Sequence, residues 1–159
     1  MFTNKKGRNK MNLTEKEKGL LKDLRAQEAL CVEKYGQYAN SAADSELQTL
    51  FSSIRETEQQ HFQTVTKMLT DGGVTVGGAG NSEALCGDTC GCGTCSCLGD
   101  AYLCQDALSM EKHASSLYDT SIFEFNDGNT RQTLNKIQSD EQSHGKRLFD
   151  YMSAHGMQA

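Results

Sequence analysis

The chain has 159 residues, enough for one domain with a substantial core. It contains no proline and no tryptophan, and its abundant Glu, Lys, Gln, Leu and Ala favour long uninterrupted helices. The net charge of −5, without a basic stripe that interleaves aromatic residues, argues against a nucleic-acid partner. No run of about 18 apolar residues is present, so the sequence predicts no membrane span.

Residues 1–12, MFTNKKGRNKMN, form a basic segment without apolar periodicity. Because such a segment has no apolar face to bury, we expect a disordered arm. No apolar region of the kind that a secretory signal needs follows it, so we expect a protein that is made and kept inside a cell.

Residues 13–70 are predicted to form a first helical hairpin. Thr14 followed by Glu17 is a capping box that begins the first helix. Residues 41–44 break the helical pattern, and Ser45 with Gln48 is predicted to cap a second helix, from residue 46 to about residue 70. The stripe of the first helix, at steps of three and four residues, is Leu21, Leu24, Glu28, Cys31, Tyr35 and Tyr38. That of the second is Leu47, Leu50, Ile54, Glu58, His61, Val65 and Met68.

Residues 71–100 differ abruptly in composition, because they hold nine of the fifteen glycines and five of the seven cysteines. We interpret them as a linker or specialised loop. Residues 101–156 are predicted to form a second hairpin. Asp100 is predicted to cap its first helix, residues 126–129 form a turn, and Gly156 ends a last helix of residues 130–155. Four long helices and no strand candidates predict an all-α bundle.

The second half of the sequence repeats the first at a shift of 83 residues. The shift places Glu28 on Glu111, Glu58 on Glu141 and His61 on His144, and Tyr35 on Tyr118 as well. In both halves 30 residues separate the early Glu from the Glu of a Glu-x-x-His, and the midpoint falls in the predicted turn. The early Glu and the Glu-x-x-His must therefore face each other at one height in each hairpin.

Six polar residues thus interrupt the apolar stripes at mid-height. Positions i and i+3 share a helix face, so the Glu and His of each pair point the same way. Four buried carboxylates would repel one another, whereas two divalent cations would neutralise them and give each imidazole a bond. Such ligands are typical of carboxylate-bridged di-iron and di-manganese bundles, and they suit zinc less well. We predict two iron ions, with manganese or zinc as alternatives, on Glu28, Glu58, His61, Glu111, Glu141 and His144.

Each feature has a simpler interpretation when taken alone. A single Glu-x-x-His is usually a solvated helix face, and a lone histidine on an apolar stripe is more often a hydrogen-bonded core residue. The coincidence of stripe, repeat and height favours the metal site. His113 and His155 show no such coincidence and are predicted at the surface or rim. Cys31 and Cys104 lie on core stripes and are predicted to be small buried hydrophobic residues.

The helical part as a whole resembles the ferritin-like superfamily, which includes ferritins, bacterioferritins and rubrerythrins. Its second half, from LSMEKHASSLYDTSI to IQSDEQSHGKRLFDYMSAHG, is more closely similar to the coat protein F family of bacterial endospores, chiefly in the run DEQSHGKRLFDYM. The resemblance implies a ferritin-like four-helix bundle of two repeated hairpins, with residues 71–100 as a long crossover between the second and third helices. A helix of about 25 residues is about 38 Å long, a distance that this segment can span.

The resemblance also implies roles for the ligands. Glu58 and Glu141 would bridge the two metals, and each metal would be completed by one further pair, Glu28 with His61 or Glu111 with His144. The family implies oxygen or peroxide chemistry at a reduced di-iron centre. If the site is catalytic, the protein is therefore an oxidoreductase of the di-iron oxidase or peroxidase type.

Two tyrosines accompany the ligands. Tyr35 and Tyr118 fall where family members place a phenol that hydrogen-bonds a ligand carboxylate. Their simpler interpretation is that of core aromatic residues.

A separate cysteine cluster, CGDTCGCGTCSC, lies within the predicted crossover. It lacks the two well-separated C-x-x-C pairs of zinc ribbons and rubredoxin-like sites. Closely spaced cysteines can bind soft metals or form disulfides between chains, and a loop of reduced thiols is the third interpretation. The residues concerned are Cys86, Cys90, Cys92, Cys95 and Cys97.

Two functions are consistent with these features. The first is a redox-active metalloprotein, favoured by the intact ligand set, because a purely structural bundle would be more stable with apolar residues there. The second is a structural spore coat component, cross-linked through its cysteines and holding a vestigial or structural metal site. The expected partners are metal ions, dioxygen or peroxide, and other copies in a homo-oligomer or coat assembly. The expected location is the mother-cell cytoplasm or the spore coat.

Overall fold

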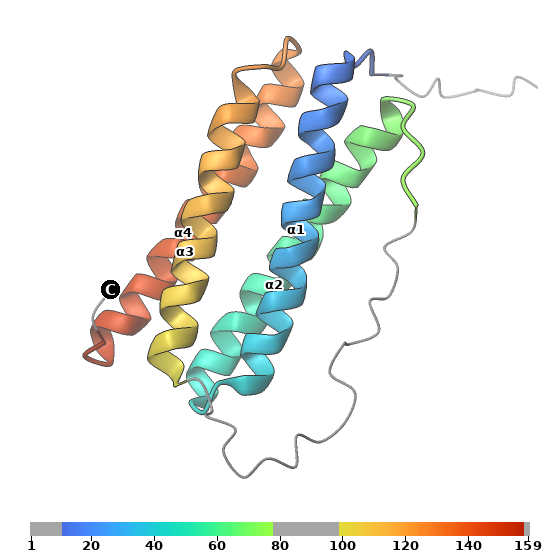
Figure 1. Cartoon of the computed structure of the whole chain (residues 1–159). Coiled ribbons are helices and arrows are strands. Elements are labelled where there is room, and N and C mark those ends of the chain that lie inside the picture. The colour runs from blue at the N-terminus through green and yellow to red at the C-terminus, as the bar shows by residue number, and fades with distance from the viewer. Residues whose placement is uncertain (1–10, 78–98, 158–159) are drawn as a thin grey trace, which may run out of the picture.

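The computed structural model describes residues 11–77 and 99–157. These residues form four helices, α1 (Glu15–Ser41), α2 (Ser45–Asp71), α3 (Asp100–Ile122) and α4 (Gly128–Ala154), and contain no strand. Helix α1 pairs with α2 and α3 pairs with α4, and the two hairpins lie side by side as one bundle (Figure 1). The predicted all-α bundle of two hairpins is confirmed.

Helix α1 begins as predicted, whereas α2 begins differently. The Thr14 hydroxyl accepts a hydrogen bond from the Glu17 amide, and the Glu17 carboxylate accepts one from the Thr14 amide, which completes the capping box. The predicted Ser45 cap of α2 is wrong. Asp44 caps this helix by accepting from the Glu46 amide, and Ser45 is the first helical residue.

The second hairpin also departs from the prediction at its helix starts. Gly99 precedes α3, and Asp100 is a helical residue rather than the cap. Asp127 caps α4 by accepting from the Thr130 amide at 2.7 Å, so Gly128 and Asn129, predicted in a turn, belong to the helix. Gly156 follows α4 with a φ of 66°, in agreement with its predicted role as a stop.

Asp100 has a different role from the one predicted. Its carboxylate accepts hydrogen bonds from the amides of Ala43 (2.8 Å) and Asp44 (3.0 Å), in the turn between α1 and α2. At the opposite end of the bundle, the Met11 amide donates to the Asp71 carbonyl (3.0 Å) beside the start of α1. The end of α2 and the start of α3 therefore lie at opposite ends of the bundle (Figure 1), as the predicted crossover requires.

Parts of the predicted organisation lie outside the described residues. These are residues 1–10 of the basic arm and residues 78–98 of the crossover, including all five clustered cysteines. None of the described helices carries an apolar stretch long enough to cross a membrane.

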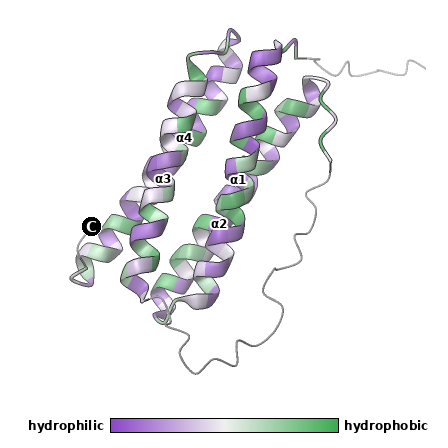
Figure 2. Cartoon of the chain, viewed as in Figure 1, coloured by the Kyte–Doolittle hydropathy of each residue, from purple (hydrophilic) through white to green (hydrophobic). Residues whose placement is uncertain are grey.

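The core consists of two apolar clusters with a polar layer between them. One cluster, near the α1–α2 turn, includes Phe51, Leu103 and Leu148, and the other, toward the α3–α4 turn, includes Leu24, Val65 and Leu134. Hydrophobic and hydrophilic segments alternate along each helix (Figure 2). Because each buried apolar side chain contributes about 1.5–3 kcal/mol, the two clusters fix the helices on both sides of the polar layer.

Candidate metal centre

The polar layer consists of the six predicted ligand residues, contributed by all four helices. Glu28 comes from α1, Glu58 and His61 from α2, Glu111 from α3, and Glu141 and His144 from α4. None is more than 4 % exposed. The structure therefore brings all six together in the interior, where unpaired polar groups are costly.

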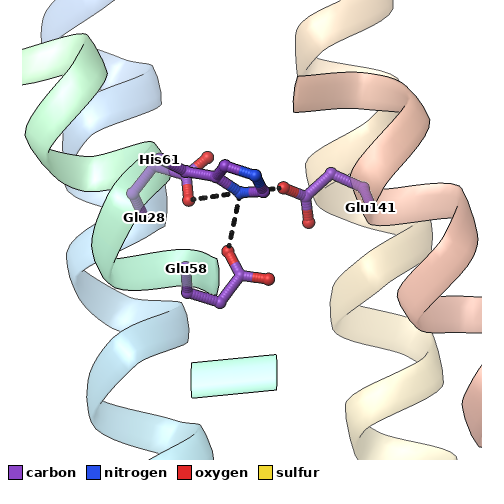
Figure 3. Close-up of side chains that lie close together, drawn as sticks. All are labelled: Glu28, Glu58, His61 and Glu141. Atoms are coloured by element: carbon purple, nitrogen blue, oxygen red, sulfur yellow. Dashed lines mark ion pairs between the residues drawn. The ribbon is translucent and has the colours of Figure 1, made fainter. Parts of the chain in front are cut away.

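His61 lies among three carboxylates (Figure 3). Its Nδ1 is 2.9 Å from Oε1 of Glu141, 3.4 Å from Oε2 of Glu58 and 3.8 Å from Oε2 of Glu28. None of the three contacts is a hydrogen bond to Nδ1. The ring nitrogen thus points into a space that the carboxylate oxygens surround.

His144 has the equivalent environment on the other side of the layer. Its Nδ1 is 2.8 Å from Oε1 of Glu58 and 3.6 Å from Oε2 of Glu111. The rings of His61 and His144 are stacked, with centroids 6.0 Å apart and planes inclined by 29°.

The ligand atoms form two groups that overlap. Glu28, Glu58, His61 and Glu141 offer one set of atoms within 4.8 Å of one another, and Glu58, Glu111, Glu141 and His144 offer the other. Glu58 and Glu141 belong to both sets. A pair of ions would therefore share these two carboxylates, and each ion would have one Glu and one His of its own.

The unsatisfied atoms test whether the layer suits metal ions. Among the described residues, every buried side-chain nitrogen or oxygen without a hydrogen bond belongs to these six residues. Both oxygens of Glu58 and of Glu141 are unsatisfied, whereas Glu28 and Glu111 each have only Oε2 unsatisfied. With Nδ1 of the two histidines, this gives four atoms for each of two ions. Oxygen and imidazole donors without thiolate fit iron or manganese.

Two tyrosines account for the remaining oxygens, and they do so across the hairpins. The hydroxyl of Tyr118 on α3 donates to Oε1 of Glu28 on α1, and that of Tyr35 on α1 donates to Oε1 of Glu111 on α3. Both tyrosines are fully buried. Each phenol therefore orients a carboxylate of the other hairpin and leaves its second oxygen facing the centre.

The protonation of the layer reflects its excess of carboxylates. Burial raises the pKa of Glu141 to about 9, and burial together with the charge of Glu58 raises that of Glu28. Burial acts against the imidazolium ions, but the neighbouring carboxylates outweigh it and raise the pKa of His61 to about 11 and that of His144 to about 9. Against the effect of its burial, the two imidazoles lower the pKa of Glu58 to about 2. In metal-free protein, bound protons supply the positive charge that the layer requires.

The second hairpin matches the model of a known protein family. Residues 99–159, which contain α3 and α4, match the family model of the Coat F domain. The chain carries a Coat F domain. The predicted similarity to the coat protein F family is thus confirmed over these residues. Comparisons with curated proteins and with solved structures gave no match.

The Coat F domain supplies only half of the polar layer. Glu111, Glu141 and His144 lie within the matched residues, whereas Glu28, Glu58 and His61 lie in the α1–α2 hairpin, outside them. The six-residue layer therefore exists only where the Coat F domain packs against the preceding hairpin.

One residue of the Coat F domain extends the site beyond the predicted set. Oδ2 of Asp140 lies 3.4 Å from Nε2 of His61, the nitrogen that faces away from the carboxylates, and 2.9 Å from the Lys136 ammonium. Sequence reasoning missed Asp140, although it directly precedes Glu141, because its partner lies on a different hairpin. The repeat places Thr57 at the equivalent position, so His144 has no equivalent carboxylate from that residue.

The remaining predicted residues lie away from the layer or beneath it. His113 is exposed. His155 lies at the rim, where its ring stacks on Tyr151 at 4.0 Å. Cys31 and Cys104 are buried thiols, as predicted, and burial raises the pKa of both, that of Cys104 to about 11.

Proposed function

We propose that this protein is a ferritin-like dinuclear metal-binding protein of the coat protein F type, that iron is its metal, and that it acts as an oxidoreductase on dioxygen or a peroxide. The observation that carries the proposal is the set of unsatisfied buried atoms, all of which belong to the six ligand residues in the described part of the chain. Leaving such atoms without partners would cost about 1–3 kcal/mol each, so a metal pair is the partner that explains their retention.

The pattern of unsatisfied oxygens supports a division of roles. Glu58 and Glu141, with two free oxygens each, would bridge the ions. Each ion would then take one terminal carboxylate oxygen and one imidazole nitrogen, from Glu28 with His61 or from Glu111 with His144. Two ions carry the charge needed to balance four carboxylates.

The chain's own side chains would then hold the centre in place. The hydroxyls of Tyr35 and Tyr118 keep the two terminal carboxylates oriented, and Asp140 orients the His61 ring from its far side. The apolar clusters above and below exclude bulk water from the layer. When bound, a pair of iron ions would supply electron exchange with dioxygen or a peroxide.

A second function, that of a structural coat component, is supported by a different observation. The Coat F domain match suggests the spore coat as the location of the protein. The cysteines that would cross-link such a component lie outside the described residues. Non-reducing electrophoresis of assembled material should then show multimers that disappear when Cys86, Cys90, Cys92, Cys95 and Cys97 are all replaced by serine. Monomers alone would count against this function.

Metal analysis of protein reconstituted anaerobically with ferrous iron tests the proposed centre. We expect two iron ions per chain in the wild type and only traces in a Glu58→Ala, Glu141→Ala double variant. Glu56→Ala with Asp150→Ala removes two exposed carboxylates from the same helices and is the matched control. Trace iron in the wild type, or equal iron in the double variant, would disprove the metal centre. Ferrous oxidation and peroxide consumption assays then separate the two candidate reactions.

A further inference from the structure

The internal repeat allows the outer surfaces of the two hairpins to be compared position by position. Nε of Arg55 donates to the Val32 carbonyl (3.2 Å) between α2 and α1. At a shift of 83 residues, Nε2 of Gln138 donates to the Ser115 carbonyl (3.0 Å) between α4 and α3. The same side-chain contact thus joins the helices of both hairpins, so their surfaces are equivalent at this level.

A second pair of equivalent positions is occupied differently. In the first hairpin, the Arg25 guanidinium lies over the Phe62 ring, 4.8 Å from its centroid. Arg25 is held there by hydrogen bonds to the Thr66 hydroxyl (2.9 Å) and the Gly77 carbonyl (3.2 Å). In the second hairpin, the repeat replaces Arg25 by Leu108 and Phe62 by Gly145.

Phe62 fills part of the surface of the first hairpin, and at the equivalent position of the second hairpin Gly145 leaves a groove. A Cβ on Gly145 would lie 3.5 Å from Cδ1 of Leu108 and 3.9 Å from Cβ of Glu111, in ordinary van der Waals contact, so the space beside Gly145 admits a methyl group without a clash. The resulting groove between α3 and α4, here called the Gly145 groove, has a volume of about 490 Å³, and Glu111 and Glu141 are among its lining residues. Since both are at most 2 % exposed, they form its floor.

Two other hollows on the bundle reach the centre less directly. The hollow between α1 and α2, lined by Gly36, Arg55 and Gln59 among others, includes none of the six ligand residues. The groove between α2 and α4 is lined by His61 and His144, whose stacked rings turn Nδ1 inward. The imidazoles therefore stand between that groove and the carboxylates, whereas two of the carboxylate-bearing residues, Glu111 and Glu141, themselves line the Gly145 groove.

The rim of the Gly145 groove indicates what it would admit. Lys112 and Asp119 carry opposite charges that cancel, and the hydroxyls of Ser115 and Ser116 and the amide of Gln142 offer hydrogen bonds. A lining of this kind favours a small uncharged molecule with hydrogen-bonding oxygens over an ion.

The geometry points to the Gly145 groove as the entry and binding site for a small uncharged peroxide, with Gly145 as the residue that sets its width. This inference rests on the proposed function, because it assumes that Glu111 and Glu141 hold metal. It adds that, in the described part of the chain, this approach lies on the Coat F hairpin and has no equivalent on the first hairpin, since Phe62 and Arg25 fill the corresponding place there.

Replacement of Gly145 tests the inference. Gly145→Phe copies the first hairpin, and Gly145→Ala narrows the groove with a Cβ in ordinary contact, so it remains informative if the phenylalanine variant does not fold. Gly19→Ala is the matched control, a helical glycine with no atom within 4 Å of an added Cβ. In thiol-blocked protein loaded with ferrous iron, which would supply the two electrons that each peroxide takes up, we expect Gly145→Phe to slow the metal-dependent consumption of tert-butyl hydroperoxide about tenfold or more, because a pocket discriminates by such factors for each added group. The iron content of Gly145→Phe should equal that of the wild type. Gly145→Ala should slow the consumption of tert-butyl hydroperoxide more than that of hydrogen peroxide.

Binding to metal-free protein separates the inference from the proposed function. Tert-butyl alcohol, a non-oxidising analogue, should shift the amide resonances of Ser115 and Ser116 in the wild type and in Gly19→Ala, but not in Gly145→Phe. A wild-type protein that binds no iron and consumes no peroxide would overturn the proposed function. The resonance shifts would still decide whether the groove binds tert-butyl alcohol. Absence of these shifts, or an iron-loaded Gly145→Phe protein as fast as the wild type, would overturn the inference.

Discussion

The two hairpins share an interior and differ on the outside. Inside, each contributes a Glu, a Glu-x-x-His and a tyrosine whose hydroxyl binds the carboxylate of the other hairpin. Outside, Phe62 corresponds to Gly145 and Thr57 to Asp140. The interior positions are tied together because every buried carboxylate needs a partner from the other half, whereas the outer positions lack that constraint. The shared interior positions are therefore those that form the site, and the differing outer positions are those that make its two sides unequal.

The largest effect is expected from comparing the carboxylates that belong to both ligand groups with those that belong to one group only. Glu58→Ala or Glu141→Ala removes a residue common to both atom groups, so each should lose both ions, with affinity reduced about a hundredfold or more. Glu28→Ala and Glu111→Ala each remove a residue of one group only and should retain about one ion per chain. Calorimetric titration with ferrous or manganous ions under nitrogen gives both numbers. Retention of two ions after Glu141→Ala would show that the carboxylates are not shared.

The stability of metal-free protein should fall as the pH rises. The folded-state pKa values of Glu141 (about 9), His144 (about 9) and His61 (about 11) lie above their unfolded values of 4.5 and 6.5, so the folded state binds more protons. That stabilisation is complete below the unfolded values and is lost as the pH rises through the folded ones. We expect the free energy of unfolding to drop by several kcal/mol between pH 5 and 9.

Circular dichroism during urea unfolding, with chelator present, measures this fall. Loading with metal should abolish it, because metal then replaces the bound protons. Since the pKa of His61 exceeds that of His144, His144→Leu should leave a fall that extends to higher pH than His61→Leu does. A metal-free stability that rises between pH 5 and 9 would contradict the protonated layer.

The outer partners of the two histidines provide a test of the asymmetry. Asp140→Asn removes the charge beside Nε2 of His61 and should weaken metal binding on that side about tenfold. Thr57→Ala changes the equivalent place near His144 and should have a smaller effect. The proton release on metal binding, followed with an indicator dye, distinguishes a change at His61 from general destabilisation. Equal effects of the two variants would argue against a special role for Asp140.

The last test concerns the two tyrosines. Tyr35→Phe and Tyr118→Phe each remove one buried hydrogen bond to a carboxylate, at an expected cost of about 1–3 kcal/mol in the free energy of unfolding. The two losses should agree closely if the interiors of the hairpins are equivalent. Urea denaturation measures both, and a large difference between them would break the symmetry at its centre.

Much of this architecture follows from regularities within the sequence. The matched spacing from Glu28 to Glu58 and from Glu111 to Glu141 predicts which residues meet, because helix geometry converts sequence distance into height. The capping box at Thr14 and Glu17 is equally local and was predicted correctly. The helical class follows from composition and periodicity, whereas the long crossover between the second and third helices is what the resemblance to the ferritin-like superfamily implies.

Contacts between distant segments could not be predicted in the same way. Asp100 is of a residue type that commonly caps helices, yet it is the first residue of α3, and its carboxylate accepts hydrogen bonds from the amides of Ala43 and Asp44, which the bundle brings to it. Asp140 lies near His61 only because α2 and α4 are adjacent. Each tyrosine donates to the opposite hairpin, a choice that depends on packing rather than on spacing. Long-range polar partners are set by tertiary structure, and a single sequence carries no direct signal for them.

The even division of ligands between the hairpins gives the connection from α2 to α3 a further role. One hairpin with its Glu and Glu-x-x-His is half of a symmetric site, so two identical hairpins could complete it only as a dimer, at a protein concentration high enough for association. Covalent linkage turns that encounter into an intramolecular one, with an effective concentration set by the linker. Assembly of the polar layer is thereby independent of dilution, and the two halves are free to diverge at positions such as Gly145.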